Sequence, residues 1–114
     1  MIYEVNTDGF RESVLERSKS GHVAVLCWAT WCGPCKSLKP ALERVAVALD
    51  LDIAMVDVEQ EGELVVRMSV RAVPTLVLFR DGLEVGRLVG GQSEAQLRTF
   101  FEKHGMAEGA LEFD

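Results

Sequence analysis

The chain has 114 residues, enough for one domain with its own hydrophobic core and too few for two. Hydrophobic residues make up 48% and charged residues 26%, a balance typical of folded rather than disordered proteins, and the net charge of −6 argues against nucleic acid or an anionic membrane surface as a partner. The N-terminus turns polar at once, and no apolar run approaches the roughly 18 residues of a membrane span. We therefore expect a cytoplasmic protein without a membrane partner.

The N-terminal quarter predicts strand, helix and strand. Ile2–Val5 has the apolar character of a short first strand. Thr7 or Asp8 is placed to cap the following helix, and Ser20-Gly21 is expected to end it. Val23–Trp28 is apolar throughout, which is typical of a central strand that is covered on both faces.

Two thiols, Cys32 and Cys35, follow this strand with two residues between them. Pro34 stands where a first helical turn accepts proline, so Cys32 is predicted to lie at a helix N-terminus. Free backbone N–H groups and the helix dipole favour an anion there, so the Cys32 thiol should ionise more readily than a free cysteine and act as a nucleophile. Cys35, one turn deeper, is placed to attack the mixed disulfide that Cys32 forms with a substrate.

A C-x-x-C pair is also half of a typical zinc site, which would need two more Cys or His in a similar cluster. His22 and His104 are isolated in the sequence. The spacing Cys27-x4-Cys32-x2-Cys35 matches the opening of a plant-type iron–sulfur site, but that site needs a fourth cysteine and the chain has three. We predict no metal and no bound cofactor, and a metal or cluster scaffold stays open as a rival interpretation.

The segment after the thiols has the strongest helical period in the chain. Its apolar residues recur three and four positions apart, at Leu38, Ala41, Leu42, Val45, Ala46 and Leu49. Pro40 interrupts the period, and proline removes one helical hydrogen bond and displaces the backbone. We expect a kink near Ser37–Pro40, and the alternative is that Pro40 starts the helix.

The second half of the chain predicts three more strands, of which the last two form a hairpin. Ile53–Val58 is another buried strand, and a short helix that uses Leu64, Val65 and Met68 should cover the sheet. Residues 75–79 and 83–89 are then joined through Asp81-Gly82, a typical two-residue hairpin turn.

The C-terminal region predicts one more helix and a tail. Ser93, with Gln96 three residues on, forms a capping box at the start of the helix. Residues 106–114 are partly acidic and show no sustained period, so we expect a flexible tail after a domain of residues 1–105.

The run Trp28-Ala29-Thr30-Trp31-Cys32-Gly33-Pro34-Cys35-Lys36 resembles the active-site signature of the thioredoxin family. Further matches follow over about residues 2–104 in the family's order and spacing: Val73-Pro74-Thr75 resembles its cis-proline loop, Phe79-Arg80-Asp81-Gly82 its hairpin turn, and Val89-Gly90 the glycine beside its substrate groove. The resemblance implies an α/β thioredoxin fold, with a central mixed five-stranded sheet flanked by four helices.

The resemblance also implies a monomeric dithiol–disulfide oxidoreductase that reduces disulfide-containing protein substrates and receives electrons from a thioredoxin reductase. It implies a cis Val73–Pro74 bond that faces the thiols. The residues it assigns to the active-site loop and groove are Trp31, Gly33, Pro34, Val73, Pro74, Thr75 and Gly90. The rival interpretation is a non-catalytic thioredoxin-fold binding subunit of a larger enzyme assembly.

Two positions depart from the family, which usually carries a buried aspartate where this chain has Leu26 and a lysine where it has Met55. Replacing both members of a buried ion pair by packed apolar side chains can be neutral or stabilising by ~1–4 kcal/mol. We expect a fold at least as stable as usual and a slower step at Cys35 at neutral pH. Asp57 or Glu59 could instead supply the missing acid.

Two further side chains near the thiols have an ordinary and a functional interpretation. Cys27 should be a small buried hydrophobe that points opposite to Leu26, and a regulatory thiol is the alternative. Lys36 could support the Cys32 thiolate or simply be a solvated lysine early in a helix, and the sequence leaves this open.

Overall fold

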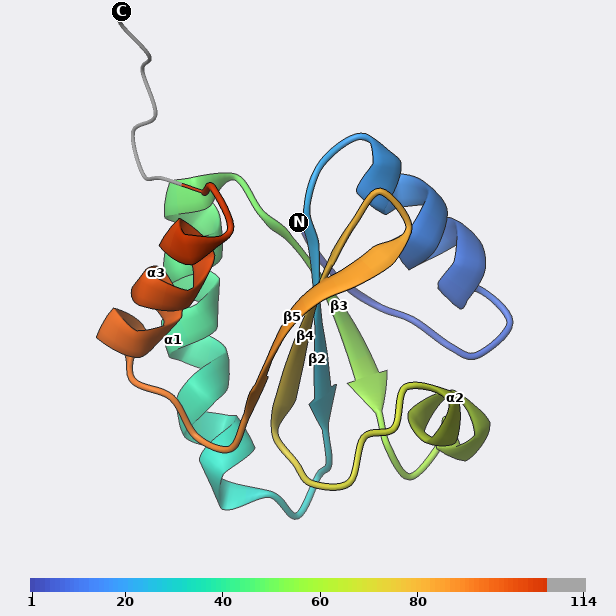
Figure 1. The fold of residues 1–114 in the computed structure, drawn as a ribbon. Coiled ribbons are helices and arrows are strands. Elements are labelled where there is room, and N and C mark those ends of the chain that lie inside the picture. Colours follow the sequence, from blue (N-terminus) through green and yellow to red (C-terminus); the bar gives the residue numbers. More distant parts are fainter. Residues whose placement is uncertain (107–114) are drawn as a thin grey trace, which may run out of the picture.

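The protein contains a five-stranded sheet with helices on both faces (Figure 1). The structure is a computed structural model that describes residues 1–106. The strands are β1 Ile2–Glu4, β2 Val23–Trp28, β3 Asp52–Asp57, β4 Thr75–Arg80 and β5 Leu83–Val89. The helical segments are η1 Arg11–Glu16, which is π-helical, η2 Arg17–Lys19, which is 3₁₀, α1 Gly33–Leu49, α2 Gly62–Arg67 and α3 Glu94–Lys103.

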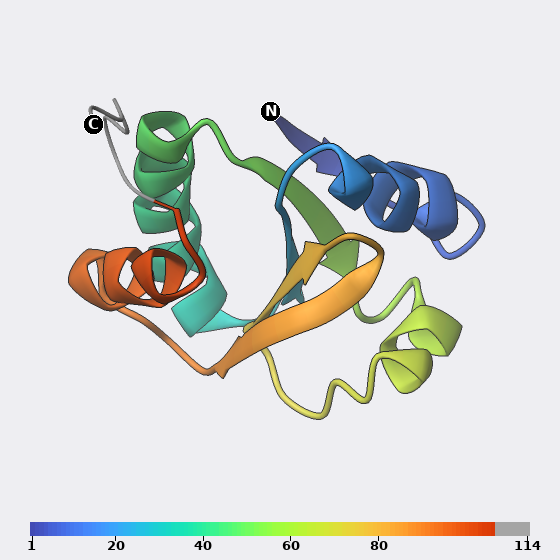
Figure 2. The same cartoon turned by 45° about the horizontal axis from the view of Figure 1, so that its top comes forward.

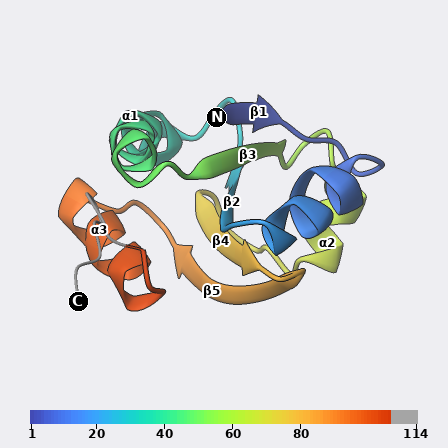
Figure 3. The same cartoon turned by 90° about the horizontal axis from the view of Figure 1, so that it is seen from above.

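The sheet is mixed, with the strand order β1-β3-β2-β4-β5. Both β1 and β2 run parallel to β3, whereas β4 is antiparallel to β2 and β5 is antiparallel to β4. Helices α1 and α3 cover one face, and the η1–η2 segment and α2 cover the other, as the view from above shows (Figure 3). The expected architecture, a mixed five-stranded sheet flanked by four helices, is confirmed when the continuous η1–η2 segment is counted as one helix.

Side-chain alternation along the central strand β2 divides the core into two clusters. Leu26 points into the cluster beneath α1 and α3, and Cys27 points into the cluster beneath η1 and α2. Both side chains are fully buried, as expected for a strand covered on both faces. The opposite orientation predicted for these two residues is confirmed.

The start of the first helix differs from the sequence prediction, which placed its cap at Thr7 or Asp8. The helix begins at Arg11, and Phe10 precedes it without any side-chain cap. Thr7 instead donates from its N–H and its hydroxyl to Oε1 of Glu61, at 2.8 and 3.0 Å. The capping prediction was wrong: the side-chain oxygen of Asn6 accepts the Gly9 N–H at 2.7 Å, and the Thr7 hydroxyl is directed at a residue 54 positions away in the sequence.

The other helix and turn predictions agree with the structure. Pro40 lies inside α1, so it does not start the helix, while the bend near Ser37–Pro40 stays a prediction. Asp81 and Gly82 both have positive φ, at 56° and 78°, as a tight hairpin turn requires. The capping box of α3 at Ser93 is present with both of its hydrogen bonds.

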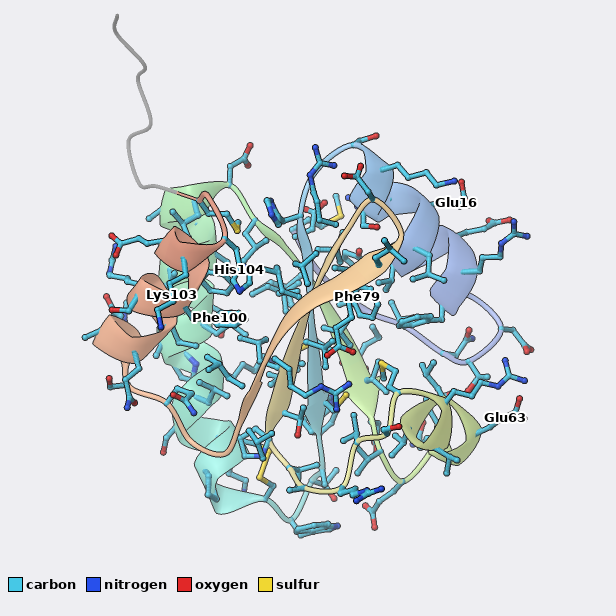
Figure 4. All side chains as sticks on the ribbon, viewed as in Figure 1. Glu16, Glu63, Phe79, Phe100, Lys103 and His104 are labelled. Carbon is cyan, nitrogen blue, oxygen red and sulfur yellow. A yellow bond between two sulfur atoms is a disulfide. The ribbon has the colours of Figure 1, made fainter. Side chains whose placement is uncertain are left out.

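Helix α3 packs beside α1, and the rings of Phe100 and of His104, the residue after α3, lie next to β5 (Figures 2 and 4). The rings of Phe100 and His104 are 4.9 Å apart between their centroids. Met106, the first residue of the predicted tail, still donates from its N–H to the Phe101 carbonyl at 3.0 Å. The rest of that tail, residues 107–114, lies outside the described residues.

Candidate active site

The two thiols lie where β2 leads into α1. Cys32 is the N-cap residue of α1, with extended backbone angles, and its Sγ accepts a hydrogen bond from the Cys35 N–H at 3.1 Å. Pro34 occupies the first turn, where its missing N–H leaves no helical hydrogen bond unmade. The local sequence therefore directs a free amide group of the helix at one sulfur atom.

The thiols form a disulfide, Cys32–Cys35, whose Cα atoms are 5.3 Å apart. Both residues are nearly buried, at 3% and 5% exposure, so accessibility does not distinguish them. They differ in their surroundings: Cys32 receives the amide hydrogen bond, and Cys35 borders a cavity beneath the loop.

The loop before β4 lies against the disulfide. The Val73–Pro74 bond is cis, as the family resemblance implied, and Val73 packs against a small cluster that contains both cysteines. The Pro74 carbonyl accepts from the Gly90 N–H at 2.8 Å, and the Thr75 hydroxyl donates to the Ala72 carbonyl at 2.6 Å. These bonds fix the loop from both ends, and the positive φ of Gly90, 91°, suits glycine.

A shallow apolar groove adjoins this loop. Trp31 projects into solvent at its edge, at 65% exposure. The groove is lined by Trp31, Val58, Val65, Val70, Arg71, Ala72 and Val73. Only Trp31 and Val73 were predicted from the sequence as groove residues. The others lie in the turn after β3, in α2 and in the segment that leads from α2 to β4.

Gly90, Gly33 and Pro34 lie outside this groove lining. Gly90 is held at the end of β5 by its bond to Pro74, and a Cβ built on the next residue, Gly91, would lie 3.7 Å from the Pro34 side chain. Gly91 is thus a further neighbour of the active-site loop that sequence reasoning missed.

A separate cavity of about 190 Å³ lies beneath the loop, beside Cys35. Its lining comprises Glu4, Leu26, Trp28, Ala29, Thr30, Cys35, Lys36, Lys39 and Met55. Leu26 and Met55 are register partners on adjacent strands and are buried, so the two departures from the family do form an apolar pair next to Cys35. Glu4 was missed because no local pattern shows which strand lies beside β3. Lys39 was missed because it is an exposed lysine of α1 without any distinguishing local signal.

Burial raises the pKa of two ionisable groups in this part of the protein, Cys27 and Glu4. Burial raises the pKa of the Cys27 thiol to about 12, despite the opposing effect of Arg87. Burial is also the main reason why the pKa of the Glu4 carboxyl is raised, and the nearby Lys39 opposes this while Asp57 adds to it. Cys27 therefore stays a neutral thiol near pH 7, which weighs against a regulatory role.

The two acids suggested by the sequence do not line the cavity. Asp57 accepts the N–H of Glu59 through its carboxylate at 2.9 Å, in the turn after β3, and Glu59 is exposed. Lys36 does line the cavity and is itself exposed at the start of α1. Of the three charged candidates from the sequence, Lys36 is thus the one that lines the same cavity as Cys35.

Residues 1–106 contain no group of three or more His, Cys, Asp or Glu side chains arranged to hold a metal ion. His104 contacts Phe100, and Cys27 faces the other side of the sheet from Leu26. Within the same described part of the chain, none of the helices has the length and apolar character needed to cross a bilayer.

Comparisons with known proteins point to one family. A sequence model of the thioredoxin family matches residues 1–103. Thioredoxin of Mycobacterium tuberculosis is 43% identical over 96 residues, which cover 82% of this chain and 81% of the relative, and thioredoxin of Staphylococcus haemolyticus is 37% identical over 105 residues, which cover 90% and 97%. The solved structure of Fasciola hepatica thioredoxin aligns with a TM-score of 0.82 and 32% identity, over 91% of this chain and 99% of that one. The solved structure of Malassezia sympodialis thioredoxin aligns with a TM-score of 0.79 and 28% identity, over 91% of this chain and 90% of that one.

Proposed function

The chain belongs to the thioredoxin family and is a dithiol–disulfide oxidoreductase that acts on protein disulfides, and we propose that Cys32 attacks the substrate and Cys35 resolves the intermediate. The observation that carries this assignment is the hydrogen bond from the Cys35 N–H to the Cys32 sulfur at the start of α1. A thiolate at that sulfur gains a donor and the positive end of the helix dipole. The non-catalytic binding subunit is not favoured, because the chain keeps both thiols and joins them.

In the proposed cycle the reduced protein meets a disulfide-containing protein. The Cys32 thiolate attacks one sulfur of that disulfide, and the other sulfur leaves as a thiolate and takes up a proton. Cys35, one helical turn away, then attacks the Cys32 sulfur of the mixed disulfide. The Cys32–Cys35 disulfide forms, the substrate leaves fully reduced, and two electrons have moved from the protein to the substrate.

Substrate recognition is assigned to the apolar groove beside Val73. An extended substrate segment would lie against the loop before β4, with main-chain pairing at Val73 and side-chain contacts to Trp31. Pro74, Thr75 and Gly90 hold that loop in place through the bonds described above, and Gly33 and Pro34 shape the turn between the thiols. A low, mostly apolar surface suits a protein that accepts many unrelated disulfides.

The partners and the setting belong to the same proposal. We place the protein in the cytoplasm as a monomer whose folded domain spans residues 1–105. A thioredoxin reductase returns two electrons to the Cys32–Cys35 disulfide after each turnover. The protein needs no bound cofactor, because the two thiols carry both electrons.

Reduction of insulin by the purified protein, with dithiothreitol as the reductant, tests the roles of the thiols. The native protein should accelerate the reaction, and Cys32→Ser should abolish the acceleration. Cys35→Ser, reduced, freed of dithiothreitol and then mixed with insulin, should accumulate a mixed disulfide that mass spectrometry detects. Cys27→Ala serves as the matched control and should keep the activity, since Cys27 lies on the opposite side of the sheet from Leu26. Activity in Cys32→Ser, or no trapped adduct in Cys35→Ser, would refute the assignment.

A further inference from the structure

We infer that Glu4 accepts, through water in the cavity beside Cys35, the proton that Cys35 loses before it closes the disulfide. This inference rests on the proposed role of Cys35 as the resolving thiol. It concerns a residue on the edge strand β1, far from the thiols in the sequence.

Strand register brings Glu4 to the cavity. In the sheet Glu4 pairs with Met55, and Met55 pairs with Leu26, so the three residues form one row across β1, β3 and β2. Leu26 and Met55 point to the face covered by α1, where they lie in the same cluster as the α1 core residues. Cys35 and Lys39 complete the lining from α1.

The chemistry of the lining singles out Glu4. Among the described residues that line the cavity, Glu4 carries the only carboxylate, and the residues next to it in the row are apolar. A volume of about 190 Å³ exceeds the space that one water molecule needs. Polar atoms are also at hand: the buried indole N–H of Trp28, another lining residue, has no hydrogen-bond partner within residues 1–106.

The charges around Glu4 suit a proton acceptor. Lys39 faces it from α1, Asp57 acts on it from β3, and Lys36 lines the same cavity. Burial raises the pKa of the Glu4 carboxyl and the positive charge of Lys39 opposes this shift. A carboxylate with a raised pKa is a stronger proton acceptor. Glu4 remains exposed as a residue, so the proton can pass on to bulk water.

The proposed step is balanced. The Cys35 thiol gives its proton to water, which passes a proton to the Glu4 carboxylate. The Cys35 thiolate attacks the Cys32 sulfur, the Cys32–Cys35 bond forms, and the bond between Cys32 and the substrate sulfur breaks. The substrate leaves as a thiolate that takes up a proton from solvent.

A stopped-flow reaction of the reduced protein with an equal amount of 5,5′-dithiobis(2-nitrobenzoate) separates the two steps. The first release of thionitrobenzoate reports attack by Cys32, and the second reports attack by Cys35. In Glu4→Gln we expect the second release to slow about tenfold at pH 7 and its pH profile to move upward, while the first release keeps its rate. A second release in Glu4→Gln with the native rate and pH profile would overturn the inference.

Three further variants separate proton transfer from other effects. Glu12→Gln removes the same charge from an exposed position in η1 and should leave both releases unchanged. Glu4→Asp keeps the acid and should keep most of the rate. Glu4→Gln with Leu26→Asp places a carboxyl inside the same cavity and should restore the second release.

Each remaining outcome also decides the question. Equal slowing of both releases in Glu4→Gln would show that Glu4 acts on the fold rather than on the proton. Failure of the native protein to give a second release, with no effect of Cys35→Ser, would instead overturn the roles of the thiols. Circular dichroism and urea unfolding of each variant report whether the fold is kept.

Discussion

The Cys35 N–H donates to the Cys32 sulfur at 3.1 Å, so the first turn of α1 stabilises negative charge on the residue that precedes it. The two cysteines are equally buried, at 3% and 5% exposure. Their chemical difference therefore comes from position: Cys32 receives the helix amide, and Cys35 lies within the helix beside a largely apolar cavity. This asymmetry makes one thiol the attacker and leaves the other to resolve.

The asymmetry predicts a difference in alkylation rate. At pH 7 the single active-site thiol of Cys35→Ser should react with iodoacetamide at least about tenfold faster than that of Cys32→Ser, because more of Cys32 is ionised at the helix N-terminus. Mass spectrometry after timed quenching measures both rates. Equal rates would mean that the helix terminus does not set the order of attack.

Cys27 should be inert in the folded protein. Burial raises the pKa of its thiol to about 12, so almost none of it is ionised below pH 9. With the Cys32–Cys35 disulfide intact, iodoacetamide at pH 8 should leave the native protein unlabelled. The same treatment in ~6 M guanidinium chloride should add one label, at Cys27. Rapid labelling of the folded protein would show that this part of the core opens easily.

Most of the fold could be predicted from the sequence because the signals for its elements come from residues that are close together in the chain. The apolar run of β2, the hairpin at Asp81-Gly82 and the capping box at Ser93 each depend on residues close together in the chain. The cap of the first helix failed for the opposite reason, since Thr7 is engaged by Glu61. The residues around Thr7 do not indicate a partner so far away in the sequence.

The candidate site shows the same division. Cys32, Cys35 and Pro34 were recognised from one continuous motif. Glu4 reaches the cavity only because β1 is placed beside β3 with Glu4 opposite Met55, and this register is a property of the whole sheet. The acid missing at Leu26 was evident from the sequence, but the substitutes predicted for it lie at the end of β3 and not on the edge strand β1.

An acid at position 26 should speed the Cys35 step and weaken the fold. Leu26 is fully buried, so Leu26→Asp loses packing and places a carboxyl among apolar side chains, at a cost of about 2–4 kcal/mol. Burial raises the folded-state pKa of such a carboxyl above its unfolded value, so the stability deficit should grow as the pH rises from 4 to about 7. Urea unfolding across this range measures it.

Leu26→Asn is the control for that experiment, because asparagine has nearly the same shape as aspartate and cannot ionise. Its deficit should stay constant with pH, and it should not accelerate the second thionitrobenzoate release. A release by Leu26→Asp no faster than native would show that the residue at position 26 does not limit turnover.

Gly86 on β5 is expected to be intolerant of a side chain. A Cβ there would lie 2.5 Å from Nε2 and 2.8 Å from Cε1 of His104, and 3.0 Å from Cε1 of Phe100. Phe100 lies in α3 and His104 directly follows it, so a side chain at position 86 requires the helix to shift or His104 to turn away. Gly86→Ala should lower the free energy of unfolding by about 1–3 kcal/mol, which urea unfolding and the change in melting temperature both measure.

Two companion variants identify the cause of that loss. A Cβ at Gly21 has no atom within 4 Å and Gly21 does not require a positive φ, so Gly21→Ala should change stability little. Gly86→Ala combined with His104→Ala removes the nearest obstacle and should recover part of the loss, although the Phe100 contact remains. If the double variant loses as much as the two single changes added together, the clash with His104 is not the cause, and the cost lies in the β5 backbone itself.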